Sequence, residues 1–167
     1  MMLSAPGRGR LLFWVVLAGG LSSCAVLGSG DDGRGPYISD ARACSGSNLE
    51  LGKAAKHFRL AMPVPAEGLR FASDLHPVSG EYALTVEFTT TAAGLKSFLS
   101  ASHLPQPERD EGAEPIDRHA SCGLTDEGFD RPQYASDDGE SSGYVRRVVV
   151  DAGSSAKVRV IVEAMDR

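Results

Sequence analysis

The chain has 167 residues, of which 42% are apolar and 23% are charged, and this composition suits one packed domain. Lysine and arginine number 17 against 22 aspartates and glutamates, so the formal net charge is −5. A nucleic-acid partner requires a basic face, and this charge balance argues against that class of partner. No apolar run reaches the roughly 18 residues that a helix needs to span a bilayer.

The first residues predict an export signal. Arg8 and Arg10 give a basic start, and an apolar stretch follows at 11–21. This order is typical of a secretory signal peptide. The alternative is a buried helix or a short membrane anchor, but a helix of this length reaches only about 16 Å, roughly half of the hydrocarbon core. We therefore predict that residues 1–23 form a cleaved leader.

The leader ends in Leu21-Ser22-Ser23-Cys24. This tetrad resembles the bacterial lipobox, in which an aliphatic residue and two small residues precede an obligatory cysteine. The resemblance implies that the Cys24 thiol forms a thioether to diacylglycerol and that a lipoprotein signal peptidase cuts between Ser23 and Cys24. The alternative is ordinary cleavage nearby with Cys24 left free, although an exposed thiol is a liability in an oxidising compartment.

Residues 24–36 predict a flexible tether that carries the lipidated Cys24. Four glycines and one proline lie in this stretch, which holds little apolar mass. Such a tether spans about 20 Å root-mean-square. Residues 37–167 then form a single extracytoplasmic domain, held by membrane lipid on the outer face of the cell membrane. Without the leader, 15 basic residues face 22 acidic ones, and the net charge becomes −7.

The two remaining cysteines predict a disulfide. Once Cys24 is lipidated, Cys44 and Cys122 are an even pair in an oxidising compartment. The alternative is a metal site, because His119 lies three residues before Cys122. Zinc sites usually show two ligand pairs at short spacing, and Cys44 has no such neighbour. We therefore predict a Cys44–Cys122 disulfide and no metal.

Alternating apolar residues predict an antiparallel sheet of four to five strands. The clearest strand is 81–88, where Tyr82, Leu84, Val86 and Phe88 share one face. The other predicted strands are 57–62, a weaker one at 69–73, and the pair 144–150 and 156–163, joined by the hairpin 151–155.

A single helix is predicted at 92–102. Thr90 or Thr91 can cap its start, and Pro105 prevents it from continuing. Its apolar stripe, which consists of Leu95, Phe98, Leu99 and Ser102, would lie on the apolar face of the sheet. The expected fold class is therefore α+β, a small antiparallel sheet with one helix packed on one face.

Residues 105–143 predict a long acidic loop. They contain eleven acids against three arginines, with little apolar periodicity. A structureless segment of this length indicates function or disorder. Calcium is an alternative ligand for the clustered carboxylates, but their spacing does not match an ordered calcium loop, which favours solvated side chains. These carboxylates are Asp126, Glu127, Asp130, Asp137, Asp138 and Glu140.

Four basic residues are concentrated near the C-terminus: Arg146, Arg147, Lys157 and Arg159. Arg146 shares the apolar face of its predicted strand, whereas Arg147 lies opposite. These side chains could form a shallow patch for anions or lipid headgroups. The alternative is a solvated sheet face whose charges discourage edge pairing.

No motif in the sequence predicts catalysis or a cofactor. There is no Gly-x-Ser-x-Gly, no Ser-x-x-Lys, no His-Glu-x-x-His and no phosphate-binding glycine loop. Because a serine–histidine–acid triad is recognised only by its geometry, composition cannot supply one. The four histidines, which are His57, His76, His103 and His119, are expected to be surface or capping residues.

The soluble part resembles small exported lipoproteins of high-GC Gram-positive bacteria. The resemblance rests on Pro-Val-Pro-Ala-Glu-Gly at 63–68 and on the helix opening Thr-Thr-Thr-Ala-Ala-Gly-Leu-Lys-Ser-Phe-Leu at 89–99. It implies an exported, anchored protein and assigns no functional residues. We expect a non-enzymatic binding or interaction domain, with an envelope protein as partner. The alternatives are an envelope-associated hydrolase, and an accessory or signalling partner of a neighbouring membrane protein.

Overall fold

The computed structural model describes residues 37–116, 119, 122–138, 143–151, 153 and 156–167. The predicted leader, Cys24 and the tether therefore lie outside the described residues. The elements, in chain order, are α1 (Leu51–His57), β1 (Glu67–Leu75), β2 (Tyr82–Thr91), α2 (Ala92–Ala101), β3 (Pro132–Asp137), β4 (Tyr144–Asp151) and β5 (Lys157–Asp166). The strands form one antiparallel sheet in the order β1-β2-β5-β4-β3. The α+β class is confirmed.

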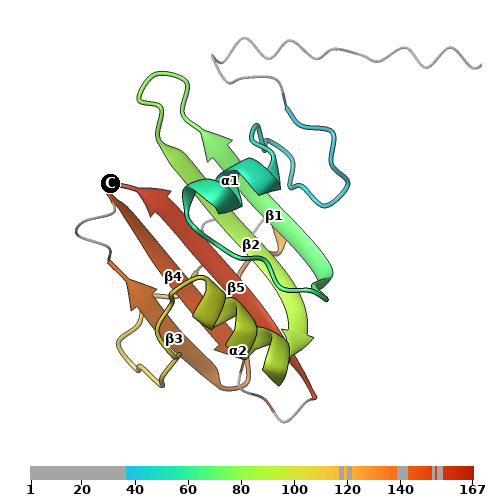
Figure 1. Cartoon of the computed structure of the whole chain (residues 1–167), viewed down its shortest axis with the longest axis vertical. Helices are drawn as coiled ribbons and strands as arrows, with labels where there is room; N and C mark the ends of the chain where they lie inside the picture. Colours follow the sequence, from blue (N-terminus) through green and yellow to red (C-terminus); the bar gives the residue numbers. More distant parts are fainter. Residues whose placement is uncertain (1–36, 117–118, 120–121, 139–142, 152, 154–155) are drawn as a thin grey trace, which may run out of the picture.

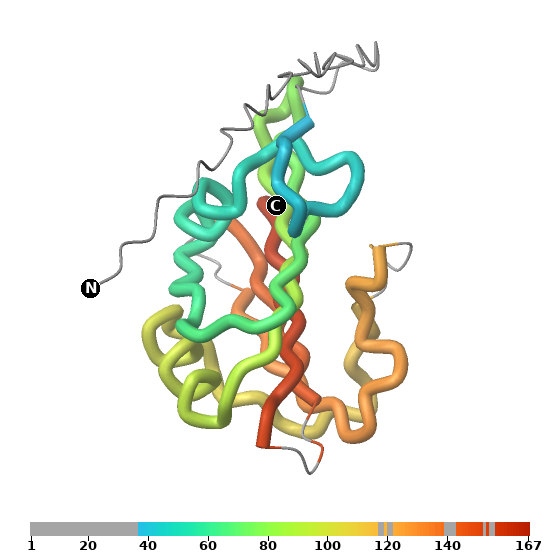
Figure 2. The backbone as a smooth tube through the Cα atoms, turned by 90° about the vertical axis from the view of Figure 1, so that its right-hand side faces the viewer, coloured from blue at the N-terminus to red at the C-terminus, as the bar shows by residue number. Residues whose placement is uncertain are grey.

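The sheet is covered on both faces. Figures 1 and 2 show α1 and α2 side by side on one face, while the segment between α2 and β3 lies against the other. We call these the helix face and the loop face. The prediction of one helix is therefore wrong in number, because α1 joins α2 on the same face. Neither helix of the described residues has the length and apolar character of a bilayer-spanning helix.

The main hydrophobic core lies on the helix face. Leu84, Val86 and Phe88 of β2 are almost completely buried there, and the Phe88 ring meets Phe98 of α2 edge to face at 5.3 Å. Every second residue of a strand points to the same face, so the alternation that predicted strand 81–88 is also what builds this core. The strands predicted at 69–73, 144–150 and 156–163 are confirmed as β1, β4 and β5.

The strand predicted at 57–62 is wrong, because this stretch is the end of α1 and the coil that follows. Phe58 and Leu60 are buried, as the predicted alternation required, but a tight helix end places them there. The sequence carries little signal for α1, because the helix is short, contains Gly52 and has no side-chain cap at Glu50.

Both helices end in the same backbone motif. After α1, Leu60 N–H donates to Ala55 O at 2.8 Å, and Arg59 adopts a positive φ of 53°. After α2, Leu104 N–H donates to Leu99 O at 2.9 Å, and His103 has the same φ of 53°. These are Schellman ends, in which the left-handed residue is usually glycine. His103 is exposed at the end of α2, which agrees with the expectation of a surface or capping histidine.

The start of α2 follows the sequence prediction. Thr91 is the N-cap, and its hydroxyl accepts a hydrogen bond from Gly94 N at 3.0 Å. Gly94 is required here, because an added Cβ would lie 2.2 Å from the Thr90 hydroxyl oxygen. That hydroxyl is fixed in turn, since it donates to Pro65 O at 3.1 Å.

The acidic segment is more ordered than a solvated loop. It contains β3, and it buries Ile116, Leu124 and Asp126. The prediction of a structureless loop over 105–143 is therefore wrong for its described part. The sequence of β3 shows no apolar alternation, because side chains on both of its faces are partly covered. Pro132 is its first residue, a position at which an edge strand tolerates proline.

Both outer borders of the sheet are paired with other parts of the chain. Beside β1, Cys44 N–H donates to Phe71 O at 2.7 Å, and Phe71 N–H donates to Arg42 O at 3.0 Å. Beside β3, Glu108 and Tyr134 exchange two backbone hydrogen bonds of 2.9 and 2.7 Å. These contacts satisfy backbone groups that an edge strand would otherwise leave open.

Candidate functional site

A disulfide joins the segment beside β1 to the acidic segment that covers the loop face. Cys44 lies in the segment paired with β1, Cys122 lies in the acidic segment, and their Cα atoms are 5.9 Å apart. The predicted Cys44–Cys122 pairing is therefore confirmed. The alternative metal site at His119 and Cys122 is wrong, because both thiols are consumed in the bond. Among the described residues, no group of three or more potential ligands could hold a metal ion.

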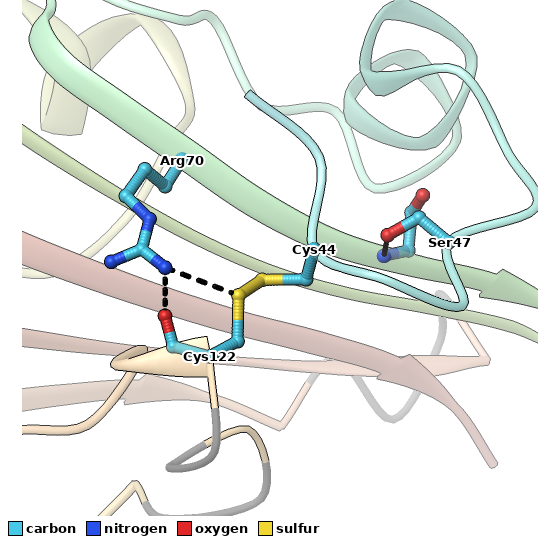
Figure 3. The surroundings of a disulfide bond; sticks show 5 residues. Cys44, Ser47, Arg70 and Cys122 are labelled. Atoms are coloured by element: carbon cyan, nitrogen blue, oxygen red, sulfur yellow. Dashed lines mark hydrogen bonds between the residues drawn. A yellow bond between two sulfur atoms is a disulfide. The ribbon is translucent and has the colours of Figure 1, made fainter. Parts of the chain in front are cut away.

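Arg70 of β1 supports the disulfide from the sheet (Figure 3). Its guanidinium donates to Cys122 O and lies 3.4 Å from Cys122 Sγ. Gly123 follows with a φ of +75°, and an added Cβ would lie 3.1 Å from Arg70 Nη1. Leu124 then packs with Cys44 and Ala72 in a small apolar cluster. The turn after Cys122 is thus shaped to fit against this arginine.

Asp126 fixes the middle of the acidic segment. Its carboxylate accepts hydrogen bonds from Ile116 N at 3.1 Å and from the Tyr134 hydroxyl at 3.3 Å. Burial raises the pKa of Tyr134 above its ordinary value, and the negative charge of Asp126 adds to this shift. Ile116 itself packs with Val149 and Ile161 on the loop face. Asp126 therefore has a structural role, as the hydrogen-bond acceptor for a backbone N–H and a phenol hydroxyl.

The other carboxylates considered for calcium do not converge among the described residues. Asp137 pairs with Arg146 at 3.0 Å, and Asp130 lies 3.8 Å from Arg131. Glu127 is exposed, and so is Asp138. Glu140 lies outside the described residues. Calcium therefore gains no support from the described part of the segment.

A shallow pocket of about 270 Å³ lies where the acidic segment meets β3 and β4. Its charged lining consists of Asp110 and Glu114 from the segment and Arg147 from β4. Arg147 donates to Glu163 Oε2 at 3.2 Å and to the backbone oxygen of Glu114, so it ties the segment to the sheet. No histidine lines this pocket. Its remaining lining is Ala113, Tyr134, Ala135, Ser136, Val148 and Val149.

The four basic residues near the C-terminus all have acidic partners. Arg159 donates to Glu87 at 2.5 Å, and its guanidinium lies 4.8 Å from the centre of the Phe129 ring. Lys157 pairs with Glu67 across the sheet. Together with the Arg147–Glu163 pair, these contacts neutralise the three members of this group that lie on the loop face. The predicted basic concentration is thus a set of ion pairs, which gives no support to a headgroup patch.

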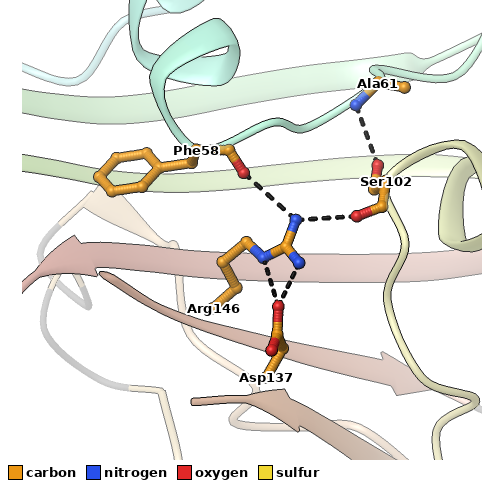
Figure 4. A network of polar contacts seen from close by, with 5 residues as sticks. All are labelled: Phe58, Ala61, Ser102, Asp137 and Arg146. Carbon is orange, nitrogen blue, oxygen red and sulfur yellow. Dashed lines mark hydrogen bonds and ion pairs between the residues drawn. The ribbon is translucent and has the colours of Figure 1, made fainter. Parts of the chain in front are cut away.

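Arg146 has a different role on the helix face (Figure 4). Its side chain is only 5% exposed, and it ion-pairs with Asp137 of β3. It also donates to the carboxy-terminal carbonyls of both helices, Phe58 O at 3.3 Å and Ser102 O at 2.8 Å. A cation favours the carboxy-terminal end of a helix, where backbone carbonyls lack partners. The Ser102 hydroxyl completes the link by accepting from Ala61 N at 2.9 Å.

The histidines have structural neighbours. His57 Nε2 lies 2.7 Å from Asp166, and its ring stacks on Tyr82 at 4.0 Å. His76 Nδ1 lies 3.0 Å from the Ser79 hydroxyl, which also donates to Glu81 at 2.9 Å.

The Ser79 group gathers a serine, a histidine and an acid, but the serine stands between the other two and all three are exposed on a turn. A catalytic triad needs the histidine in the middle. The group is therefore a turn network and gives no support to the hydrolase alternative.

The predicted lipidation site, Cys24, and the predicted cleavage position after Ser23 lie outside the described residues. Comparison with protein families, with curated proteins and with solved structures finds no match to this chain. The chemistry of its own residues therefore carries the functional argument.

Proposed function

We propose that this chain is a lipoprotein held on the extracytoplasmic face of the cell membrane through Cys24, and that residues 37–167 form a non-enzymatic binding domain. The observation that carries the anchor is the sequence Leu21-Ser22-Ser23-Cys24 at the end of an apolar leader. The disulfide supports it, because Cys44 and Cys122 take each other as partners and leave Cys24 as the third cysteine. A disulfide of this kind also suits a compartment outside the cytoplasm.

The binding role is supported by the pocket beside β3. It combines a guanidinium, two carboxylates and the partly exposed side chains of Ala113 and Tyr134. This mixture suits contact with a side chain or loop of an envelope protein. Because Arg147 holds both the sheet and the acidic segment, the pocket keeps its shape without a ligand. The protein would then present a preformed surface to its partner, which reduces the entropic cost of binding.

The anchor is tested by the intact mass of protein extracted from membranes. We expect the loss of residues 1–23, the addition of diacylglycerol with any further acyl chain, and a mass that lacks two hydrogens for the disulfide. The Cys24→Ala variant should lose the lipid and leave the membrane fraction once uncleaved protein has been excluded. If that variant stays with the membrane like the parent protein, the lipid anchor is wrong.

The binding role is tested by site-specific cross-linking in membranes. A photoreactive residue replaces Ser136, which lies in the pocket lining, or Ser100, which is equally exposed but lies on α2 on the other face of the sheet. We expect a defined protein adduct only from position 136. Adducts of the same pattern from both positions, or none from either, would contradict a binding role for the pocket.

A further inference from the structure

We propose that the end of the domain formed by Tyr37 and the β1–β2 turn, residues 76–81, docks onto the headgroup layer of the membrane. This inference rests on the proposed lipid anchor and adds an orientation to it. The large apolar side chains exposed among the described residues are Tyr37 at 49%, Val64 at 94% and Val78 at 89%. Two of them, Tyr37 and Val78, lie at the end where the predicted tether joins the domain.

Hydrogen bonds hold Ile38, which follows Tyr37, and the start of the turn at the same end of the sheet. Ile38 N–H donates to Ser47 O at 3.1 Å, and Asn48 holds the last residues of β1 through Asp74 at 2.6 Å and Leu75 N at 2.8 Å. The β1–β2 turn begins directly after Leu75. Figures 1 and 2 both show the first described residues and this turn at one end of the molecule.

The turn presents Val78 at its tip. His76 N–H donates to Glu81 O at 2.8 Å, and Gly80 N–H donates to His76 O at 2.9 Å, so the backbone closes beneath Val78. Gly80 has a φ of 73°, which glycine adopts without strain. A closed turn holds its apolar side chain outward at little entropic cost. Valine at the tip and tyrosine beside it suit the boundary between headgroups and acyl chains.

Most of the acidic charge of the domain lies away from this end. Arg42 donates to Asp40 at 2.8 Å and holds the pKa of that carboxyl at about 2, so the pair carries no net charge near neutral pH. Glu81 is the acid within the turn, and it accepts from Ser79. The acidic segment lies in the half of the molecule away from the turn, as Figure 2 shows. The segment in which carboxylates are most concentrated would therefore lie away from anionic headgroups, while Asp74 and Glu81 stay at the docking end.

Because the lipid anchor already holds the domain at the membrane, even a weak contact of this end with the headgroups is sufficient to orient it. A lipid on Cys24 with a tether of about 20 Å keeps the domain at millimolar effective concentration near the membrane surface. Two apolar side chains that would not bind a membrane alone can then set the orientation of a molecule that is already held there.

The experiment uses tryptophan as a depth probe, because the single tryptophan of the chain, Trp14, lies in the predicted leader. The lipidated full-length protein is purified as Val78→Trp or Val64→Trp and reconstituted in phosphatidylethanolamine and phosphatidylglycerol vesicles with brominated acyl chains. Position 64 is the matched control: it is equally exposed, but it precedes β1, whose nine residues span roughly 30 Å between the two positions.

We expect the emission of Val78→Trp to be quenched at least about twofold more than that of Val64→Trp. Adding Tyr37→Asp to Val78→Trp should reduce the quenching. Equal quenching at both positions, or none at either while the protein floats with the vesicles, would overturn the proposed orientation and leave the anchor intact. If the emission of Val78→Trp shifts to the blue without quenching, the indole at position 78 lies against protein and not in the membrane. This result would also overturn the proposed orientation.

A separate measurement on the protein without substitutions tests the lipid anchor itself. Protein without substitutions should show no tryptophan emission, because the leader is removed, and it should float with vesicles. If it retains Trp14 emission and does not float, the lipid anchor is wrong, and the orientation that rests on it is wrong as well.

Discussion

On the helix face, Val86, Phe88 and Val162 are completely buried in one continuous apolar core with side chains of α1 and α2. On the loop face, the same strands place Thr85, Glu87 and Glu163 beneath a segment with few apolar residues. The first face is held by packing, which needs no particular partner for each side chain. The second is held by a disulfide, ion pairs and a buried carboxylate, each of which needs one defined partner. The two faces of one sheet therefore should respond differently to mutation.

The disulfide gives the largest expected difference between the two faces. The Cys44→Ser, Cys122→Ser protein should lose about 4 kcal/mol of unfolding free energy, because the bond closes a loop with a sequence separation of 78. Native-state hydrogen exchange should show protection lost first in the acidic segment and β3, while β2 and β5 stay protected. Equal loss of protection on both faces would show that they unfold as one unit and would break the comparison.

Substitution of two adjacent arginines, one on each face, compares directly how much a cation stabilises each face. Arg146→Met should cost about 3 kcal/mol, because it leaves two helix carbonyls and Asp137 without their cation. Arg147→Met should cost less, about 2 kcal/mol: it takes this cation from the buried Glu163, but the arginine is 26% exposed and water can replace part of its contacts. Urea unfolding of both variants gives the two values. Equal costs would mean that the faces do not differ in burial of charge.

The helix ends offer a stabilising change on the helix face. Arg59→Gly and His103→Gly should each raise the unfolding free energy by about 1 kcal/mol, since both residues have positive φ and exposed side chains. Thermal unfolding measures the gain. Lys96→Gly, an exposed position inside α2, serves as the control and should cost about 1 kcal/mol. A loss at 59 and 103 similar to that at 96 would contradict the Schellman geometry.

The smallest expected effect concerns pH and the loop face. Because the folded protein raises the pKa of Tyr134 above 10.0, the unfolded chain loses this proton first as the pH rises. The contribution of Tyr134 is therefore complete below pH 10.0 and is lost as the pH rises through the folded pKa. Ultraviolet titration of the phenol should show the raised pKa, and Asp126→Asn should lower it. A titration unchanged by Asp126→Asn would remove the charge of Asp126 as a cause.

Sequence patterns predicted the parts of the fold that depend on local periodicity. The alternation over 81–88, a threonine cap at 90 or 91 and the even cysteine pair each carry their own physical signal, and the structure contains all three, with Thr91 as the cap. The partners of Arg146 carried no such signal, because Phe58, Ser102 and Asp137 are distant in the sequence and meet only in the folded chain. Placing Arg146 on the apolar face was nevertheless correct, and a cation on such a face indicates a buried partner.

The loop face could not be predicted for a related reason. A strand that alternates between apolar and polar residues predicts a solvated face at its polar positions. Glu163 is instead only 6% exposed, since Arg147 accompanies it beneath the acidic segment. A paired charge looks the same in sequence as a solvated one. The even cysteine count was the one sequence feature that tied this segment to the rest of the domain.

The paired borders of the sheet affect how copies of this protein tolerate crowding. Arg42 and Cys44 occupy the outer side of β1, Glu108 occupies the middle of β3, and Pro132 offers no N–H at the start of that strand. Strands of neighbouring molecules then find few free backbone groups with which to extend the sheet. At high local concentration, copies of this domain should therefore resist association through extension of the sheet.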